Sequence, residues 1–157
     1  MPEKVNPIPD GYHSVTPYLI VNDGARALEF YKQAFGATEL FRMEGPEGQI
    51  GHAEIKIGDS HVMLADEHPK MGARSPQSIG GSPVSLMLYV EDVDATVAQA
   101  VEAGAKLTRS VANQFYGDRT GGVTDPFGHA WYVATHGEVV PHEELQKRAA
   151  AAQQGGA

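Results

Sequence analysis

The sequence predicts an α+β protein made of two βαβββ modules, whose curved mixed sheets surround a concave trough. The first observation is an internal repeat, because the apolar run at residues 15–23 returns at residues 84–92. The second is that a helical pattern follows each copy and ends at a Gly-Ala pair. The third is a series of short strand patterns after each helix. A duplicated strand–helix unit predicts a pseudo-symmetric fold, in which a shared site takes its residues in pairs.

The composition narrows the classes of function. The chain has 157 residues, 41% hydrophobic content and no cysteine, so it can build a core but has no disulfide or thiolate metal site. The formal net charge of −8 disfavours nucleic acid, because phosphate binding needs a basic surface. The N-terminus lacks the apolar core of a signal peptide, and no stretch has membrane-spanning length. We therefore expect a cytoplasmic protein with no nucleic-acid or membrane partner.

The first module is expected at residues 14–65. A strand at 15–21 precedes Asp23, whose carboxylate can accept hydrogen bonds from the first amides of a helix. Apolar residues then recur at helical spacing as far as Phe35, and Gly36 favours the left-handed conformation that ends a helix. The strands after this helix are predicted at residues 38–43, 51–57 and 61–64.

The second module is expected at residues 84–136, after a linker at 66–83. The linker is dense in Pro, Gly and Ser, so we expect a flexible segment without a regular element, which could act as a lid. The module then repeats the order of the first, with a strand at 84–90, Asp92 as the helix cap and a helix that ends at Gly104. Its remaining strands are predicted at residues 106–111, 121–124 and 129–134.

Both ends of the chain lie outside the predicted modules. Residues 1–13 contain three prolines and are expected to run extended over the surface as an N-terminal arm. Residues 137–157 form a C-terminal tail that is partly helical, and the helix is expected to be solvated and frayed.

Strand alternation assigns side chains to the two faces of each sheet. Leu19 and Val21 share a face in the first strand. In the repeat of this strand, aliphatic residues share one face in the same way, and Met87 and Tyr89 lie on the other face. The aliphatic set is expected to pack on the helices and the mixed set to face the trough. The trough-facing candidates are Tyr18, His52, Glu54, Met63, Tyr89 and Tyr132. Apolar walls with a few polar anchors are typical of a small-molecule cavity.

The segment 113–119 precedes the seventh predicted strand and contains two aromatic residues. Phe115 and Tyr116 beside Arg119 could clamp a planar or anionic ligand. Alternatively, Asp118 and Arg119 pair with each other and only shape the loop. Trp131 alternates away from Tyr132, so it is expected in the core.

Among the seven histidines, His52 and His61 are the most informative. His52 and Glu54 lie two residues apart on one strand face. This spacing suits a bridging ligand or a proton relay, and a structural hydrogen-bonded pair is the alternative. His129 is expected to hydrogen-bond locally. The histidines expected to be solvated are His13, His68, His136 and His142.

Three motifs indicate a family. They are the segment 17–23, the segment 89–94, and an Asp-Pro-Phe-Gly turn at 125–128 before the last strand, which is the most specific of the three. On these motifs the chain resembles the vicinal-oxygen-chelate superfamily, which includes glyoxalase I, extradiol dioxygenases and bleomycin and fosfomycin resistance proteins. The resemblance covers residues 14–136 and implies the paired βαβββ fold, but a fold does not determine chemistry. It also implies a homodimer, because members often complete their troughs across a two-fold axis.

The resemblance also indicates where a metal would bind. Members that use a metal take one ligand, usually His or Glu, from the first and from the last strand of each module. The matching positions here are Thr16, Met63, Ser85 and Tyr132. These residue types do not suit zinc, iron or manganese, so we expect no metal or other cofactor there. A rebuilt site of His52, Glu54 and His61 is the alternative.

The leading hypothesis is a glyoxalase-like protein of the bleomycin-resistance type that binds a small organic molecule without the usual metal ligands. The predicted ligand-binding residues are Tyr18, Met63, Tyr89, Phe115, Tyr116, Arg119 and Tyr132. One alternative is a lyase or isomerase that acts on a small oxygenated metabolite, with Glu54 or His52 as the catalytic general base. Another is a metal-dependent glyoxalase or dioxygenase. Whether the chain is an enzyme, and which ligand it takes, stay open at this stage.

Overall fold

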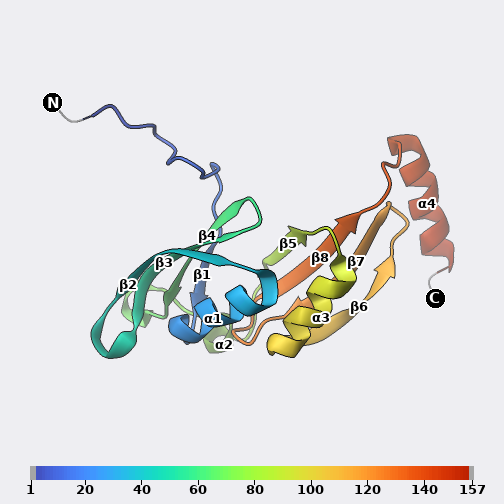
Figure 1. The fold of residues 1–157 in the computed structure, drawn as a ribbon. Coiled ribbons are helices and arrows are strands. Elements are labelled where there is room, and N and C mark those ends of the chain that lie inside the picture. The colour runs from blue at the N-terminus through green and yellow to red at the C-terminus, as the bar shows by residue number, and fades with distance from the viewer. Residues whose placement is uncertain (1–2, 156–157) are drawn as a thin grey trace. The chain divides into compact units, whose positions relative to one another are not determined.

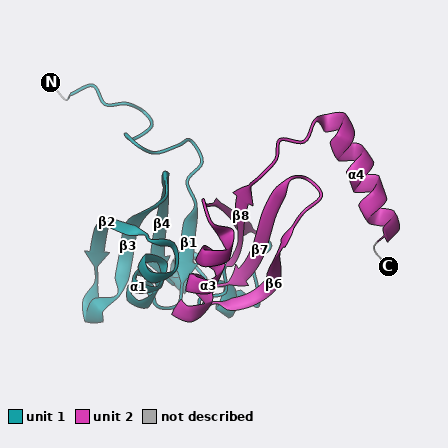
Figure 2. Cartoon of the chain, turned by 45° about the vertical axis from the view of Figure 1, so that its right-hand side comes forward, with its two compact units in different colours: residues 1–83, 126–129 teal, residues 84–125, 130–157 magenta. Residues whose placement is uncertain are grey.

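The computed structural model describes residues 3–155 and divides into two compact units, each built around one four-stranded sheet (Figures 1 and 2). Unit 1 comprises Met1–Pro83 and Pro126–His129, and unit 2 comprises Val84–Asp125 and Ala130–Ala157. Each sheet has one parallel and two antiparallel strand pairs. The predicted α+β class with two βαβββ modules is therefore confirmed, and the trough between the sheets stays a prediction.

Unit 1 follows the predicted order of elements. Its elements are β1 (Tyr18–Val21), α1 (Gly24–Phe35), β2 (Thr38–Glu44), the short helix η1 (Pro46–Gly48), β3 (Ile50–Ile57) and β4 (Ser60–Asp66). The strand order in the sheet is β1-β4-β3-β2, with β1 parallel to β4. Helix α1 packs against β2, β3 and β4 (Figure 1).

The ends of α1 agree with the local signals in the sequence. The Asp23 carboxylate accepts a hydrogen bond from the Arg26 amide at 3.2 Å, which satisfies an N–H that the helix itself leaves unpaired. At the other end Gly36 adopts the left-handed conformation, with φ of 68°. Between these ends, Leu28 and Tyr31 are fully buried on the apolar face of the helix.

Alternation along β3 separates the core from the candidate site. Ala53, Ile55 and Ile57 are buried on the side of α1, where they form much of the core of unit 1. His52 and Glu54 alternate with them and are half-buried on the opposite face. Both placements agree with the period-two pattern of the sequence.

The prediction that residues 66–83 contain no regular element is wrong. The segment contains η2 (Pro69–Met71) and α2 (Pro76–Ile79). The carboxylate of Glu67 accepts hydrogen bonds from the Ser75 amide, at 2.7 Å, and from the Ser78 hydroxyl. Pro76 occupies the first position of α2, where a missing N–H costs nothing. The segment is therefore held by contacts that its composition does not reveal.

The Asp-Pro-Phe-Gly turn contributes to the core of unit 1, although it lies at residues 125–128, far from the rest of that unit in the sequence. Phe127 is fully buried, and its ring centroid lies 6.1 Å from that of Phe30 and 6.3 Å from that of Tyr31. His129 was expected to bond locally, but its Nε2 lies 2.9 Å from the carbonyl oxygen of Ile20. That partner lies far away in the sequence, so only the tertiary fold could place it.

Unit 2 repeats the plan of unit 1 and adds a C-terminal helix. Its elements are β5 (Ser85–Tyr89), α3 (Val93–Ala103), β6 (Lys106–Asn113), β7 (Asp118–Thr124), β8 (Ala130–His136) and α4 (His142–Gly155). The strand order is β5-β8-β7-β6. Asp92 caps α3 as predicted, by accepting from the Ala95 amide at 3.0 Å. Trp131 is in the core as predicted, and its indole N–H donates to Asp125 at 2.9 Å.

Helix α4, at the C-terminal end of the ribbon in Figure 1, has no buried residue, but an ion pair attaches it to the rest of unit 2. The Arg148 guanidinium donates to both carboxylate oxygens of Glu138, each at 3.0 Å, and to the carbonyl oxygen of Phe115 at 3.2 Å. The tail is thus helical as predicted, and it is anchored as well as solvated. Within residues 3–155, no helix has the length and apolar character needed to span a membrane.

Candidate functional site

A group of neighbouring polar side chains lies on the face of the first sheet opposite α1. The Tyr18 hydroxyl lies 2.8 Å from His52 Nδ1, and His52 Nε2 lies 3.8 Å from Glu54 Oε2. Met63 pairs in register with both Tyr18 and Glu54, so it lies between them. The fold thus brings together four of the predicted site residues. We call Tyr18, His52, Glu54 and Met63 the β3-face cluster.

The N-terminal arm adds a residue that sequence reasoning missed. Tyr12 donates a hydrogen bond from its hydroxyl to Glu54 Oε1, and its ring stacks on His61 with centroids 4.1 Å apart. Gly11 lies so close to His61 that a Cβ there would be 2.6 Å from the imidazole Cε1. The arm was expected to run extended over the surface, and no periodic pattern marks Tyr12 as different from its neighbours. Its only signal is that it is the first aromatic residue of the chain.

Both phenols of this site hold their protons firmly. Burial, followed by the hydrogen bond to Glu54 and the charge of Glu54, raises the pKa of Tyr12 to about 12. Burial and then the Glu54 charge also raise the pKa of Tyr18. Tyr12 and Tyr18 are therefore hydrogen-bond donors at neutral pH, and the Glu54 carboxylate is the acceptor that the cluster surrounds.

Exposed apolar side chains border the cluster on β2. Phe41 and Met43 are paired in register with Glu54 and His52, and they are 46% and 54% exposed. The Phe41 ring centroid lies 6.4 Å from that of His52. A few polar groups beside accessible apolar surface are the usual ingredients of a site for an organic ligand.

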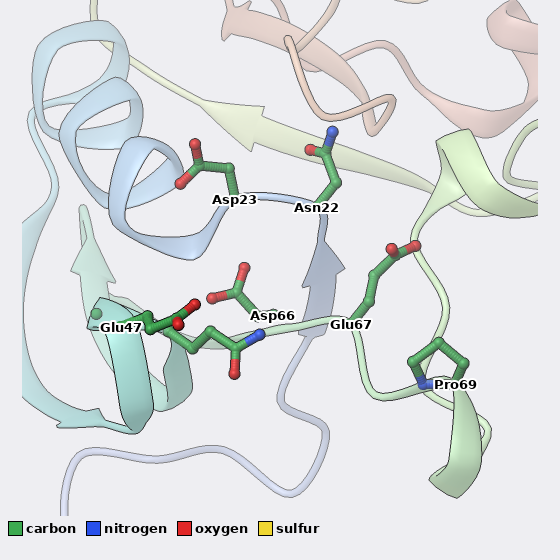
Figure 3. A pocket seen from close by; sticks show the side chains of 8 residues that line it. Asn22, Asp23, Glu47, Asp66, Glu67 and Pro69 are labelled. Carbon is green, nitrogen blue, oxygen red and sulfur yellow. The ribbon is translucent and has the colours of Figure 1, made fainter.

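A separate pocket of about 350 Å³ lies at the end of β1 and β4 and contains four carboxylates (Figure 3). They belong to Asp23, Glu47, Asp66 and Glu67. Asp66 accepts hydrogen bonds from the Gly24 and Ile50 amides, both at 2.7 Å. Because Asp23, Asp66 and Glu67 all accept from neighbouring amides or hydroxyls, the pocket wall is largely structural.

In unit 2, Tyr89 and Tyr132 lie on one face of the sheet, as the alternation predicts. The Arg109 guanidinium lies 5.7 Å from the centroid of the Tyr132 ring, within the range of a cation–π contact. The rings of Phe115 and Tyr116 meet edge to face between β6 and β7, with centroids 5.2 Å apart.

Arg119 and Asp118 have different partners. The Arg119 guanidinium binds the Asp94 carboxylate on α3 through two hydrogen bonds, of 2.7 and 2.9 Å. Asp118 accepts from His136 Nδ1 at 2.6 Å. The alternative in which Asp118 and Arg119 pair with each other is therefore wrong, because adjacent residues of a strand point to opposite faces. His136, expected only to be solvated, is bonded to a buried carboxylate.

A comparison with protein families agrees with this fold. Residues 11–133 match the model of the Glyoxalase/Bleomycin resistance protein/Dioxygenase superfamily. The chain belongs to this superfamily. The resemblance that the sequence motifs indicated is thus confirmed, including the Asp-Pro-Phe-Gly turn that contributes Phe127 to the core.

Several proteins are similar to this superfamily member over most of their length. The uncharacterized protein Rv0887c of Mycobacterium tuberculosis is 43% identical over 136 residues, which is 85% of this chain and 80% of the relative. The solved product of the Arabidopsis thaliana gene At5g48480 is 31% identical with a TM-score of 0.64, over 78% of this chain and 98% of that one. TioX from a Micromonospora species is 26% identical with a TM-score of 0.62, over 79% and 98% of the two chains.

The metal positions of the superfamily do not fit a metal in this chain. The matching residues Thr16, Met63, Ser85 and Tyr132 supply neither imidazole nor carboxylate. Across residues 3–155, no group of three or more His, Cys, Asp or Glu side chains is arranged to hold an ion, and this includes His52, Glu54 and His61. The absence of a metal cofactor nevertheless stays a prediction, which elemental analysis of the purified protein can test.

Proposed function

We propose that this superfamily member binds a small organic molecule at the β3-face cluster, through side chains instead of a chelated metal. The observation that supports this most directly is the ordered contact of Tyr18, His52 and Glu54 on an exposed sheet face. Polar groups already held in place lose little conformational freedom when a ligand arrives, which favours binding. Met63 and the neighbouring Phe41 supply apolar contact area.

Tyr12 suggests the class of ligand. Its phenol ring stacks on His61 while its hydroxyl donates to Glu54, as an aromatic alcohol would. The residue belongs to the N-terminal arm, whose preceding residues 3–11 are exposed. A phenolic ligand can replace Tyr12 by making the same two contacts. We therefore assign the site to small aromatic hydroxyl compounds, with Tyr12 as an internal competitor.

Titration of the protein with 4-fluorophenol, followed by fluorine NMR, tests this function. Glu54→Gln removes the charged acceptor and is expected to weaken binding roughly tenfold. Tyr12→Ala removes the competitor and is expected to strengthen binding. Ile55→Val is the matched control, because Ile55 is the next residue of β3 and is buried on the opposite face. If wild type, Glu54→Gln and Tyr12→Ala bind the phenol equally, the proposed site is wrong.

A second candidate is a lyase or isomerase in which Glu54 or His52 removes a proton. It is favoured by the distance of 3.8 Å between His52 and Glu54 and by the two protonated phenols beside them. Glu54 or His52 would be the base and the phenols would be the acids, all in one place. Glu54 would take a proton from carbon next to a carbonyl, and a phenol would donate one to the resulting enolate oxygen. Deuterium uptake by hydroxyacetone in heavy water, lost in Glu54→Gln, distinguishes this candidate from binding alone.

The remaining predicted ligand-binding residues belong to unit 2, outside the β3-face cluster, and their role stays a prediction. They are Tyr89, Phe115, Tyr116, Arg119 and Tyr132. Arg119 is the weakest of them, because Asp94 already holds its guanidinium. A homodimer, a cytoplasmic location and the absence of nucleic-acid partners likewise stay predictions.

A further inference from the structure

We propose that unit 2 contains a second small-molecule site, which binds the ammonium group of a small organic amine beside His136. A cavity of about 490 Å³ lies at the end of β5 and β8, lined by Tyr89, Val90, Glu91, Thr135 and His136. This site is distinct from the β3-face cluster, because all of its lining residues belong to unit 2.

The cavity exists because β8 is longer than its parallel neighbour. The last residue of β5, Tyr89, pairs with Ala134, and the chain then turns toward α3. Strand β8 continues for two more residues, to His136, which pairs with Asp118 of β7. Thr135 holds the turn in place, since its hydroxyl donates to the Val90 carbonyl and accepts from the Val93 amide, each at 2.9 Å. The space beside the end of β8 is therefore left open by the topology itself.

Asp118 fixes the orientation of the His136 ring. The carboxylate is 7% exposed, and it accepts from His136 Nδ1 at 2.6 Å and from the Tyr89 hydroxyl at 3.5 Å. Because a carboxylate can only accept, a proton lies on Nδ1, and Nε2 is an acceptor whenever it carries no proton of its own. The His136 side chain is 56% exposed, so this nitrogen is accessible to a ligand in the cavity.

The lining residues favour a positively charged ligand. His136 Nε2 and the Glu91 carboxylate are acceptors, and the aromatic face of Tyr89 attracts cations. The five lining residues include no Lys or Arg, so none of them provides a permanent positive charge that would balance the negative charge of a carboxylate or phosphate ligand. An ammonium group, which has three donors and no acceptor, matches this set.

A comparison of the two modules explains why this site lies in the second module. The internal offset of 69 residues places Glu67 at the position of His136. Glu67 binds the Ser75 amide and the Ser78 hydroxyl and thereby holds the segment before β5. His136 does not hold a comparable segment after β8. Its second ring nitrogen is therefore available for a ligand.

Histidine-detected proton–nitrogen NMR during titration with ethanolamine tests this site, with ethylene glycol and glycolate as neutral and anionic probes of similar size. We expect His136 to show the Nδ1-protonated form and a saturable shift with ethanolamine alone. The His52, His61 and His142 signals should not move, which separates this result from any failure of the phenol site. Assignment of the His136 signal comes from His136→Gln.

Glu91→Gln is the decisive variant, because Glu91 is exposed and its replacement does not endanger the fold. We expect it to weaken ethanolamine binding roughly tenfold. Glu143→Gln, on the exposed first turn of α4, is the matched control and should bind as wild type. The inference is overturned if His136 shows no saturable shift, if glycolate or ethylene glycol binds equally well, or if Glu91→Gln binds like wild type.

Discussion

Asp66 and Thr135 occupy equivalent positions in the two modules, and each binds the first amide of the long helix of its own module. The Asp66 carboxylate accepts from Gly24 at 2.7 Å, and the Thr135 hydroxyl accepts from Val93 at 2.9 Å. Both donors are also related by the offset of 69 residues. The duplication therefore preserves a physical contact, between the end of the last strand and the start of the helix, while the residue type has changed.

Removing either contact is expected to destabilise the protein. Asp66→Ala leaves the Gly24 and Ile50 amides without their acceptor, and Thr135→Val leaves one amide and one carbonyl unpaired. Because unpaired half-buried groups lose hydration without compensation, we expect about 1–3 kcal/mol in the free energy of unfolding for each variant. Urea unfolding measures this, with the exposed Thr38→Val as control. Equal stability of Thr135→Val and Thr38→Val would contradict the role of this hydroxyl.

Phe127→Ala is expected to destabilise unit 1 strongly. The ring is fully buried against Phe30 and Tyr31, and the Arg26 guanidinium lies 5.7 Å from its centroid. Deleting a buried aromatic ring costs about 3–5 kcal/mol. Hydrogen exchange should show the loss of protection in α1, where these contacts lie. The exposed Phe115→Ala is the control, and a similar small effect of both variants would show that the turn is not part of the core.

The pH dependence of stability at alkaline pH should report on Tyr12. Its pKa rises from 10.0 to about 12 on folding, so between these values the folded state binds the proton that the unfolded state has released. The stabilisation is complete below pH 10 and is lost as the pH rises toward 12. Tyr12→Phe, which cannot ionise, should therefore lose less stability than wild type over this interval in unfolding titrations.

Glu54→Gln gives a further check on the same residue. It removes the charge and weakens the hydrogen bond that raise the pKa of Tyr12, so that burial is the main remaining cause. Carbon NMR of the tyrosine ring should then show a lower pKa for Tyr12 than in wild type. An unchanged value would mean that Tyr12 does not contact Glu54 in solution.

Gly121→Ala is expected to disturb the packing of α3 on the second sheet. An added Cβ would lie 2.7 Å from Val111 Cγ2 and 3.2 Å from Val97 Cγ2, and both side chains would have to move. Overpacking of this kind costs about 1–3 kcal/mol. The companion Val111→Ala should restore part of the loss by removing the closest methyl group. Gly45→Ala is the control, because its nearest neighbour would be 3.8 Å away.

Local patterns accounted for the elements and for part of the candidate site. The helix caps at Asp23 and Asp92 and the burial of Ile55 beside His52 and Glu54 all follow from spacing within a few residues. Strand ends were less accurate, because pairing with a neighbour decides where a strand stops. For example, β8 continues to His136, two residues beyond the predicted end, because β7 supplies Asp118 as its partner.

The sequence by itself determined the duplicated βαβββ plan, the two helices that cover the sheets and the face on which His52 and Glu54 lie. These properties depend on the periods of helix and strand, which act over a few residues. Only the tertiary structure decided that Tyr12 reaches Glu54, that Asp118 binds His136 and that Phe127 enters the core of unit 1. Those contacts join residues whose spacing follows no local period, so they arise only when the strands pair and the core closes.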